Sequence, residues 1–253
     1  LRPPRWRARH VGQAVAAVLA LAVAGAAVWN LSGGQAATTS ARTDVGEQRT
    51  AALPDGSVVT LNVVTQIDYR IAADRRQVWI RDGEAMFFVH KDAERPFLVH
   101  AGSTDIRAIG TAFNVRRRDG ATEVAVLDGI VSVTTSRPGA VAQSVRLVAG
   151  QKLRLQDGAG PAPPTVQLAA PQTIAEWRLR TVTYEDATLA DVVRDVNRFY
   201  PRQLAVEDPE LARRRVTLRL QVEDRQQTLD TLGALVGAEL RERGGTDLLV
   251  AAS

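Results

Sequence analysis

The residues most able to do chemistry are Gly110 and Thr111, a glycine followed by a hydroxyl-bearing residue. A threonine hydroxyl can attack the carbonyl carbon of the preceding residue, which converts the peptide bond into an ester that water then hydrolyses. Distortion of the scissile peptide helps such self-cleavage, because it weakens the amide resonance. The same pair also fits a glycine bulge followed by an ordinary strand threonine. The residue types alone leave both interpretations open.

The segment that positions this pair, residues 105–115, is predicted to be extended, because it is rich in β-branched and aromatic residues and has no proline. Its large apolar residues change parity at the glycine: Ile106 and Ala108, then Phe113 and Val115. A strand with one buried face cannot change parity without an extra residue or a kink. Gly110 permits either, because it lacks a Cβ and tolerates unusual dihedrals. We therefore expect the Gly110–Thr111 peptide to lie at a bulge or bend.

Other catalytic or binding chemistry is not predicted. The chain has no cysteine, and its histidines (His10, His90 and His100) lack metal-ligand spacing, so we expect no metal and no cofactor. His100 could cross a hairpin to accept a proton from Thr111, although a lone strand histidine is usually a surface residue. Glu84 follows a turn glycine and is interpreted as structural. The protein is therefore not expected to be an enzyme, apart from a single-turnover N-to-O acyl shift at Gly110–Thr111.

The formal net charge of +4 belongs to the N-terminus alone. Residues 1–31 contain no acidic residue and four basic ones, namely Arg2, Arg5, Arg7 and Arg9. The other 28 basic residues balance the 28 acidic ones, so residues 32–253 carry no net charge. A domain without a basic excess lacks the means to bind phosphates, and no nucleic-acid partner is expected.

An apolar run over residues 11–31 follows this basic flank (residues 1–10) and is predicted to be a transmembrane helix. As a helix it would rise about 31 Å, close to the hydrocarbon thickness of a bilayer. Arginines on the N-terminal side favour a cytoplasmic N-terminus. A cleaved signal peptide with small residues at 24–26 is the alternative. Both interpretations place the remainder of the chain outside the cytoplasm, and the leading Leu1 suggests a fragment of a longer protein.

The rest of the chain is predicted to form two folded units. Residues 32–44 are expected to be a flexible tether, and residues 45–157 a mainly β domain of stacked short strands, sandwich- or barrel-like. Asp-Gly pairs are expected to mark its turns, at 55–56, 82–83, 119–120, 128–129 and 157–158, with a two-residue hairpin at 128–129.

Residues 158–173 contain four prolines and are interpreted as a linker. Residues 174–253 are predicted to form a small α/β domain of order β-α-β-β-α-β-β. Its first helix covers 188–200 and begins with Thr188 and Asp191 as a capping pair. Its second helix is capped by Asp224 and ends at Gly237.

Four motifs in the β region resemble the FecR family, the transmembrane sensors and sigma-factor regulators of bacterial iron-uptake signalling. They are LPDGS (53–57), DGEAMF (82–87), RPFLV (95–99) and IGTAFNV (109–115). Residues 174–253 more loosely resemble the short signalling domains of secretins and TonB-dependent receptors. The family resemblance implies self-cleavage between Gly110 and Thr111.

The resemblance also implies a single-span inner-membrane sensor with its C-terminal bulk in the periplasm. Such a sensor relays occupancy of an outer-membrane TonB-dependent transporter, as in siderophore uptake, to an extracytoplasmic-function sigma factor. The implied partners are the transporter's N-terminal signalling domain (through 174–253), the sigma factor (through a cytoplasmic segment absent from this chain) and periplasmic and intramembrane proteases. A periplasmic adhesion or assembly module built on the same β scaffold remains the alternative, and an enzyme acting on wall polysaccharide is a more distant one.

Overall fold

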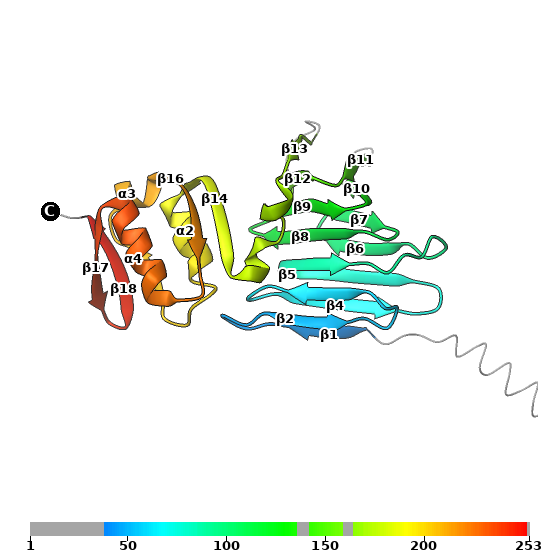
Figure 1. The fold of residues 1–253 in the computed structure, drawn as a ribbon, viewed down its shortest axis with the longest axis horizontal. Helices are drawn as coiled ribbons and strands as arrows, with labels where there is room; N and C mark the ends of the chain where they lie inside the picture. The colour runs from blue at the N-terminus through cyan, green and yellow to red at the C-terminus, as the bar shows by residue number, and fades with distance from the viewer. Residues whose placement is uncertain (1–37, 136–141, 159–163, 252–253) are drawn as a thin grey trace, which may run out of the picture. The chain divides into compact units, whose positions relative to one another are not determined.

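A computed structural model describes residues 38–135, 142–158 and 164–251, which belong to one unit (Figure 1). The predicted basic flank (1–10) and transmembrane helix (11–31) lie outside the described residues. Among the residues that are described, no helix has both the length and the apolar character needed to cross a membrane.

The first part of this unit is a mainly β domain, as the sequence predicts. Its strands, all joined by hydrogen bonds into one continuous 13-stranded arrangement, are β1 (Thr39–Arg42), β2 (Arg49–Ala52), β3 (Val58–Leu61), β4 (Gln66–Ile71), β5 (Arg76–Phe88), β6 (Phe97–Ala101), β7 (Thr104–Ala108), β8 (Ala112–Arg118), β9 (Ala121–Asp128), β10 (Ile130–Thr135), β11 (Gln143–Val148), β12 (Gln151–Gln156) and β13 (Val166–Leu168). One layer has the order β1-β4-β5-β6-β7-β10-β11 and the other β2-β3-β5-β8-β9-β12-β13. The long strand β5 belongs to both layers.

Strand β5 changes layers at Gly83. Up to Asp82 it pairs with β4, and from Gly83 onward it pairs with β8. Gly83 has a φ of +101°, and a Cβ there would lie 2.3 Å from Thr65 Oγ1. Only glycine fits both the conformation and the space. The expected turn at 82–83 is therefore wrong: this Asp-Gly pair bends a strand instead of ending it.

The core of the β domain lies between the two layers, because alternate residues of each strand turn their side chains toward the other layer. Three buried phenylalanines mark its centre. Phe87 on β5 stacks on Phe113 of β8 with ring centroids 5.3 Å apart, and its centroid lies 5.9 Å from that of Phe97 on β6. Strands on both sides of the Gly110–Thr111 bond thus share one hydrophobic core.

The Asp128-Gly129 pair does not close a hairpin, contrary to expectation. Strand β9 pairs with β8 and β12, whereas β10 pairs with β7 and β11 in the other layer. Gly129, at a φ of +82°, lets the chain cross between the layers. Turn chemistry indicated where the chain changes direction, but which partners the two strands take depends on contacts distant in sequence.

Two segments expected to be irregular contribute strands. Residues 39–42 of the expected tether form β1, which pairs with β4. Residues 166–168 of the expected linker form β13, which pairs with β12. Both strands are short and largely exposed, so they lack the apolar alternation by which a strand is recognised in a sequence.

The second part of the unit is a small α/β domain, as predicted. After two 3₁₀ turns, η1 (Pro171–Thr173) and η2 (Glu176–Leu179), it contains β14 (Thr181–Thr188), α2 (Leu189–Val196), β15 (Leu204–Val206), α3 (Pro209–Arg213), β16 (Arg215–Gln221), α4 (Arg225–Val236), β17 (Ala238–Arg243) and β18 (Thr246–Ala251). Strands β14 and β16 pair with each other, and β15, β18 and β17 form a second sheet.

The predicted caps of this domain are confirmed. Thr188 Oγ1 accepts a hydrogen bond from Asp191 N, Asp224 accepts one from Gln227 N, and α4 ends at Gly237 in the left-handed conformation. The prediction omitted α3, a five-residue helix with Asp208 as its cap and Pro209 in its first turn. Its shortness kept it from producing a helical period.

Candidate functional site

The Gly110–Thr111 peptide lies at a bend, as expected, but the segment around it is two strands and not one. Strand β7 ends at Ala108 and pairs with β6 and β10, whereas β8 begins at Ala112 and pairs with β5 and β9. The bend carries the chain from one layer to the other. The pairing of β8 with β9 shifts register between Ala112 and Phe113, directly after the bend. This change of layer accounts for the change of parity in the sequence.

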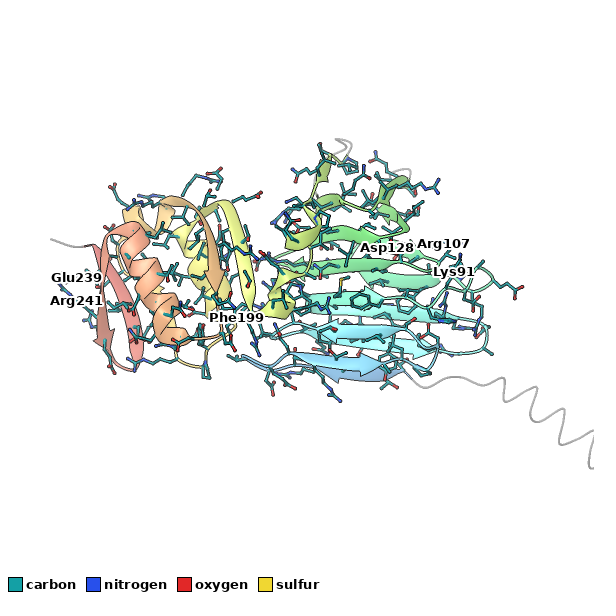
Figure 2. All side chains as sticks on the ribbon, in the orientation of Figure 1. Lys91, Arg107, Asp128, Phe199, Glu239 and Arg241 are labelled. Carbon is teal, nitrogen blue, oxygen red and sulfur yellow. The ribbon has the colours of Figure 1, made fainter. Side chains whose placement is uncertain are left out.

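Gly110 is needed at the bend for space, not for an unusual dihedral. Its φ lies outside the left-handed region, so the expected dihedral strain at this residue is absent. A Cβ on Gly110 would instead lie 2.8 Å from Lys91 Cβ and 2.9 Å from Lys91 Cα. Because one of these atoms is backbone, the contact cannot be relieved by a rotamer change. Arg107, Lys91 and Asp128 are labelled at this end of the domain in Figure 2.

The side chain of Thr111 is buried, with 6% of the residue exposed. Its Oγ1 makes no hydrogen bond to any described residue. A buried hydroxyl without a partner costs free energy and is uncommon. It also leaves the oxygen lone pairs free for attack on a neighbouring carbonyl carbon. The carbonyl oxygen of Gly110, where negative charge would develop, likewise accepts no hydrogen bond from the described part of the chain.

The two carbonyl groups that flank Gly110 are both held by one segment, residues 89–95, which we call the strap. Val89 N donates to Thr111 O and Asp92 N donates to Ile109 O, each over 2.9 Å. With Lys91 packed against Gly110, the strap contacts the backbone on both sides of the peptide bond. The bond is therefore fixed in place by main-chain contacts.

The strap is in turn shaped by the Asp92 carboxylate. Its Oδ1 accepts from Glu94 N and Arg95 N, and its Oδ2 lies 2.8 Å from Arg95 Nε. The hydrogen bond from the Arg95 side chain, followed by the one from the Arg95 backbone, lowers the pKa of Asp92 below its ordinary value.

A carboxyl group whose pKa is lower in the folded state stabilises that state above its ordinary pKa, and this contribution is lost as the pH falls through the lowered value. We therefore expect the parent to be more stable than Asp92→Asn at neutral pH. The difference should begin to shrink as the pH falls below about 4, the ordinary pKa of an aspartate, and should vanish only below the lowered pKa of the folded state. Urea unfolding of both proteins at a series of pH values from neutral to acid measures the difference in their free energy of unfolding. A difference that stays constant over this range would contradict the assignment.

His100 does not serve Thr111. Its Nδ1 lies 2.7 Å from Asp105 Oδ1, and its ring stacks on Trp79 with centroids 5.3 Å apart. The β6–β7 register places His100 directly opposite Asp105. The ring is thus engaged by its own hairpin and its stacking partner.

Trp177 of η2 packs close to the bend, in contact with the start of β8. It is 4% exposed and lies in one apolar cluster with Met86, Ala112 and Ala175. Its Nε1 donates to Asn114 Oδ1 over 3.2 Å. Ala112 directly follows Thr111 in the chain, so the segment that opens the α/β domain contacts β8 one residue from the candidate bond.

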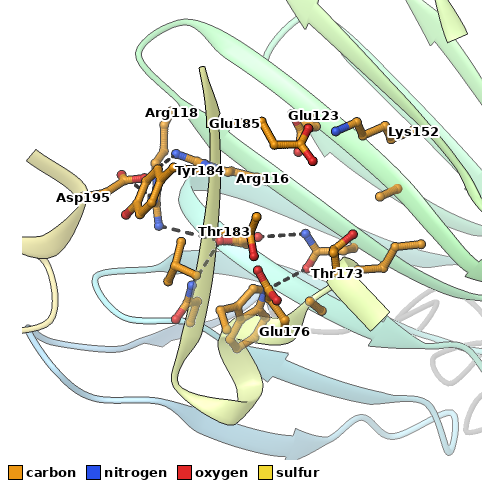
Figure 3. Close-up of a pocket in the computed structure, with 18 of the residues that line it drawn as sticks. Arg116, Arg118, Glu123, Lys152, Thr173, Glu176, Thr183, Tyr184, Glu185 and Asp195 are labelled. Carbon is orange, nitrogen blue, oxygen red and sulfur yellow. Dashed lines mark hydrogen bonds and ion pairs between the residues drawn. The ribbon is translucent and has the colours of Figure 1, made fainter. Parts of the chain in front are cut away.

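A polar cleft of about 710 Å³ continues from this contact along β8 and β14. Three of its charged side chains pair across the cleft (Figure 3): Asp195 of α2 binds Arg116 and Arg118 of β8, each over 2.8 Å. Glu84 accepts a hydrogen bond from the side-chain amide of Asn62 and another from that of Asn114. Burial would lower the pKa of Arg116, but Asp195 and Glu84 raise it above its ordinary value. Burial and then Asp195 raise the pKa of Tyr184.

The described residues provide no arrangement suited to a metal ion. In the ranges 38–135, 142–158 and 164–251, no three His, Asp or Glu side chains lie close enough to share one. The ion pairs of Asp195 with Arg116 and Arg118 join α2 to β8, and thus link the α/β domain to the β domain.

Comparison with known proteins shows what this β domain is. Residues 39–132 match the family described as FecR protein. The chain contains a FecR domain. The resemblance drawn from the sequence motifs is therefore confirmed. The match includes Gly110, Thr111 and the whole strap. None of the curated proteins matches the chain.

Two crystal structures of a protein from Parabacteroides distasonis ATCC 8503, described as a "putative anti-sigma factor", have the same fold. One, at 2.50 Å resolution, has a TM-score of 0.74 and 23% identity, and covers 86% of this chain and 100% of its own. The other, at 1.65 Å, has a TM-score of 0.73 and 23% identity, and covers 85% of this chain and 100% of its own. Both alignments extend beyond the FecR domain, so the fold is shared well past residue 132.

Proposed function

We propose that this chain belongs to a regulator of an extracytoplasmic-function sigma factor. The match of residues 39–132 to the FecR family is the observation that carries the proposal. The fold shared with the Parabacteroides distasonis protein agrees with it, since that protein is described as a "putative anti-sigma factor" and the alignment covers 86% of this chain.

In this proposal the regulator crosses the bacterial inner membrane once. Residues 11–31 are the span, and the four arginines before it keep the N-terminus in the cytoplasm. The FecR and α/β domains then lie in the periplasm. Their lack of net charge and the absence of cysteine from the chain are compatible with that location.

The α/β domain receives the signal from the N-terminal signalling domain of a TonB-dependent transporter. Strand β17 pairs only with β18 among the described residues, so one row of its backbone groups is open to a further strand. Glu239 and Arg241, labelled in Figure 2, form an exposed pair on β17. Charges on an open edge oppose non-specific pairing and favour a strand with complementary charges.

Self-cleavage between Gly110 and Thr111 converts the regulator into two polypeptides before any signal arrives. Thr111 Oγ1 attacks the Gly110 carbonyl carbon, the C–N bond breaks, and the hydroxyl proton ends on the released amine. Water then hydrolyses the ester, which leaves a carboxylate on Gly110 and restores the hydroxyl of an N-terminal Thr111. The unpartnered hydroxyl and the main-chain contacts of the strap support this chemistry.

The two products stay together because strands of each are paired with strands of the other. Strand β5, before the cut, pairs with β8 after it, and β7 pairs with β10. Separation would require breaking these ladders and opening the shared core. Because packing alone holds the two products together, binding of the transporter's signalling domain to the α/β domain can rearrange them. Periplasmic and intramembrane proteolysis then frees the cytoplasmic segment with its sigma factor.

Sequencing of the transcripts of cells with and without this gene tests the regulatory proposal. We expect the expression of one set of genes with a common promoter, including an outer-membrane receptor gene, to change when the gene is removed. Their expression should recover when the whole gene is restored. Unchanged transcripts in both comparisons would refute sigma regulation. The result is independent of whether the chain cleaves itself.

A further inference from the structure

The largest of the fully buried side chains is charged. Arg76 on β5 has a side chain with 0% exposure, and its guanidinium lies inside the strap. Nε donates to Arg95 O over 2.6 Å, Nη1 to His90 O over 2.8 Å, and Nη2 to Asp92 O over 3.1 Å. One guanidinium thus satisfies three carbonyl groups of the strap, which only the planar fork of arginine can do.

Asp55 balances the charge of Arg76 and connects the LPDGS motif (53–57) to the strap. Its carboxylate, 2% exposed, lies 3.2 Å from Arg76 Nη1 and accepts from Ser57 N and Ser57 Oγ. Ser57 Oγ in turn accepts a hydrogen bond from His90 N over 3.0 Å. The turn at 53–57, the strap and β5 therefore meet in one buried polar cluster. We call Arg76, Asp55 and Ser57 the hub.

The strap links the hub to the candidate bond. The hub holds the strap through its carbonyl groups and His90 N, and the strap holds Ile109 O and Thr111 O through the amides of Asp92 and Val89. No other described donor reaches these two backbone carbonyls. The position of the peptide bond thus depends on a chain of hydrogen bonds that begins at a buried guanidinium.

We propose that Arg76, Asp55 and Ser57 are positioning residues for self-cleavage at Gly110–Thr111. The inference rests on the proposed function. The hub touches neither the attacking oxygen nor the carbonyl carbon; it fixes the strap, and the strap fixes the peptide relative to the Thr111 hydroxyl. A misplacement of about 1 Å between reacting groups costs about 100-fold in rate.

Filling space in the core would not require a buried charge. Replacing a buried ion pair by apolar residues of similar volume is often neutral or stabilising, because both charges must be desolvated. The hub instead uses its charge to order a segment of irregular backbone, whose carbonyl groups apolar side chains could not satisfy. That segment is the one in contact with the bond.

The test follows cleavage of the newly synthesised full chain over time, by the mass of the fragment that begins at Thr111. Three variants are compared with the parent: Arg76→Met, Arg76→Lys and Ser57→Ala. Leu153→Ala is the control, since Leu153 is a buried core residue of β12 outside the strap. Amide hydrogen exchange at Val89 and Asp92 is measured for the same proteins.

We expect Arg76→Met to slow cleavage about 100-fold and Ser57→Ala about tenfold. Arg76→Lys should restore part of the loss, because it keeps a charge beside Asp55. Exchange at Val89 and Asp92 should quicken in the hub variants. Leu153→Ala should lower stability and leave the cleavage rate within about twofold of the parent.

A parent that cleaves while the hub variants cleave equally fast would overturn the inference and leave the proposed function standing. Slowing by Leu153→Ala as great as by Arg76→Met would also overturn it, because loss of stability would then explain both. A parent that never cleaves would overturn the self-cleavage proposal and this inference with it. If Arg76→Met fails to fold, Ser57→Ala decides, since it removes a single hydroxyl.

Discussion

The Thr111→Ala variant is expected to remain one polypeptide of the full length, whereas the parent separates into two on a denaturing gel. The substitution removes the only oxygen that can attack Gly110 from its C-terminal neighbour. Folding should change little, because Thr111 Oγ1 makes no hydrogen bond among the described residues. Loss of the methyl group beside Gly129 should cost about 1 kcal/mol, small against the stability of a typical domain.

Two further substitutions separate chemistry from shape at this position. Thr111→Val keeps the size of the side chain without the hydroxyl, and should also stay intact. Thr111→Ser keeps the hydroxyl without the methyl group, and should retain cleavage at a reduced rate. Cleavage of the alanine or valine variant at this bond would show that Thr111 is not the nucleophile.

The second large effect is expected at Trp177, which attaches the opening of the α/β domain to β8. Trp177→Ala should destabilise the protein by about 3–5 kcal/mol, the usual cost of removing a buried tryptophan. It removes the packing on Met86 and Ala112 and leaves Asn114 Oδ1 without its donor. We expect the single unfolding transition in urea to divide into two, as the α/β domain unfolds apart from the FecR domain.

A matched control lies two residues away in the same 3₁₀ turn. Leu179 is 73% exposed. Leu179→Ala should therefore alter the free energy of unfolding by no more than about 0.5 kcal/mol. Equal destabilisation by the two substitutions, or a Trp177→Ala transition as cooperative as that of the parent, would mean that Trp177 does not join the domains.

The class of each domain could be predicted from local patterns. Short β-prone runs separated by Asp-Gly pairs indicated the β domain, and helical spacing with caps at Thr188 and Asp224 indicated the α/β domain. These signals depend on residues close together in the sequence. The bend at Gly110 could also be predicted, since a change of parity on one buried face requires it.

The arrangement around the bond could not be predicted in the same way. The hub joins Asp55 and Ser57 of a turn and Arg76 of β5 to the strap, and these segments lie far apart in the sequence. A buried arginine looks the same in the sequence as an exposed one. Gly110 was expected at the bend both because it lacks a Cβ and because it tolerates unusual dihedrals. The structure uses the first property, since Lys91 occupies the space of the missing side chain.

The layer change at β5 was missed for a related reason. An Asp-Gly pair is the usual sign of a turn, and at 55–56 and 119–120 it does mark turns. At 82–83 the same pair lies inside a strand, because Thr65 packs against the glycine and the chain continues into the second layer. Local chemistry permits both outcomes, and the tertiary contact selects one.

The most direct measurement is the intact mass of the purified protein after denaturation. Self-cleavage predicts two fragments, one ending at Gly110 and one beginning at Thr111, which together exceed the mass of the uncut chain by one water molecule. A single species with the mass of the uncut chain would contradict the account.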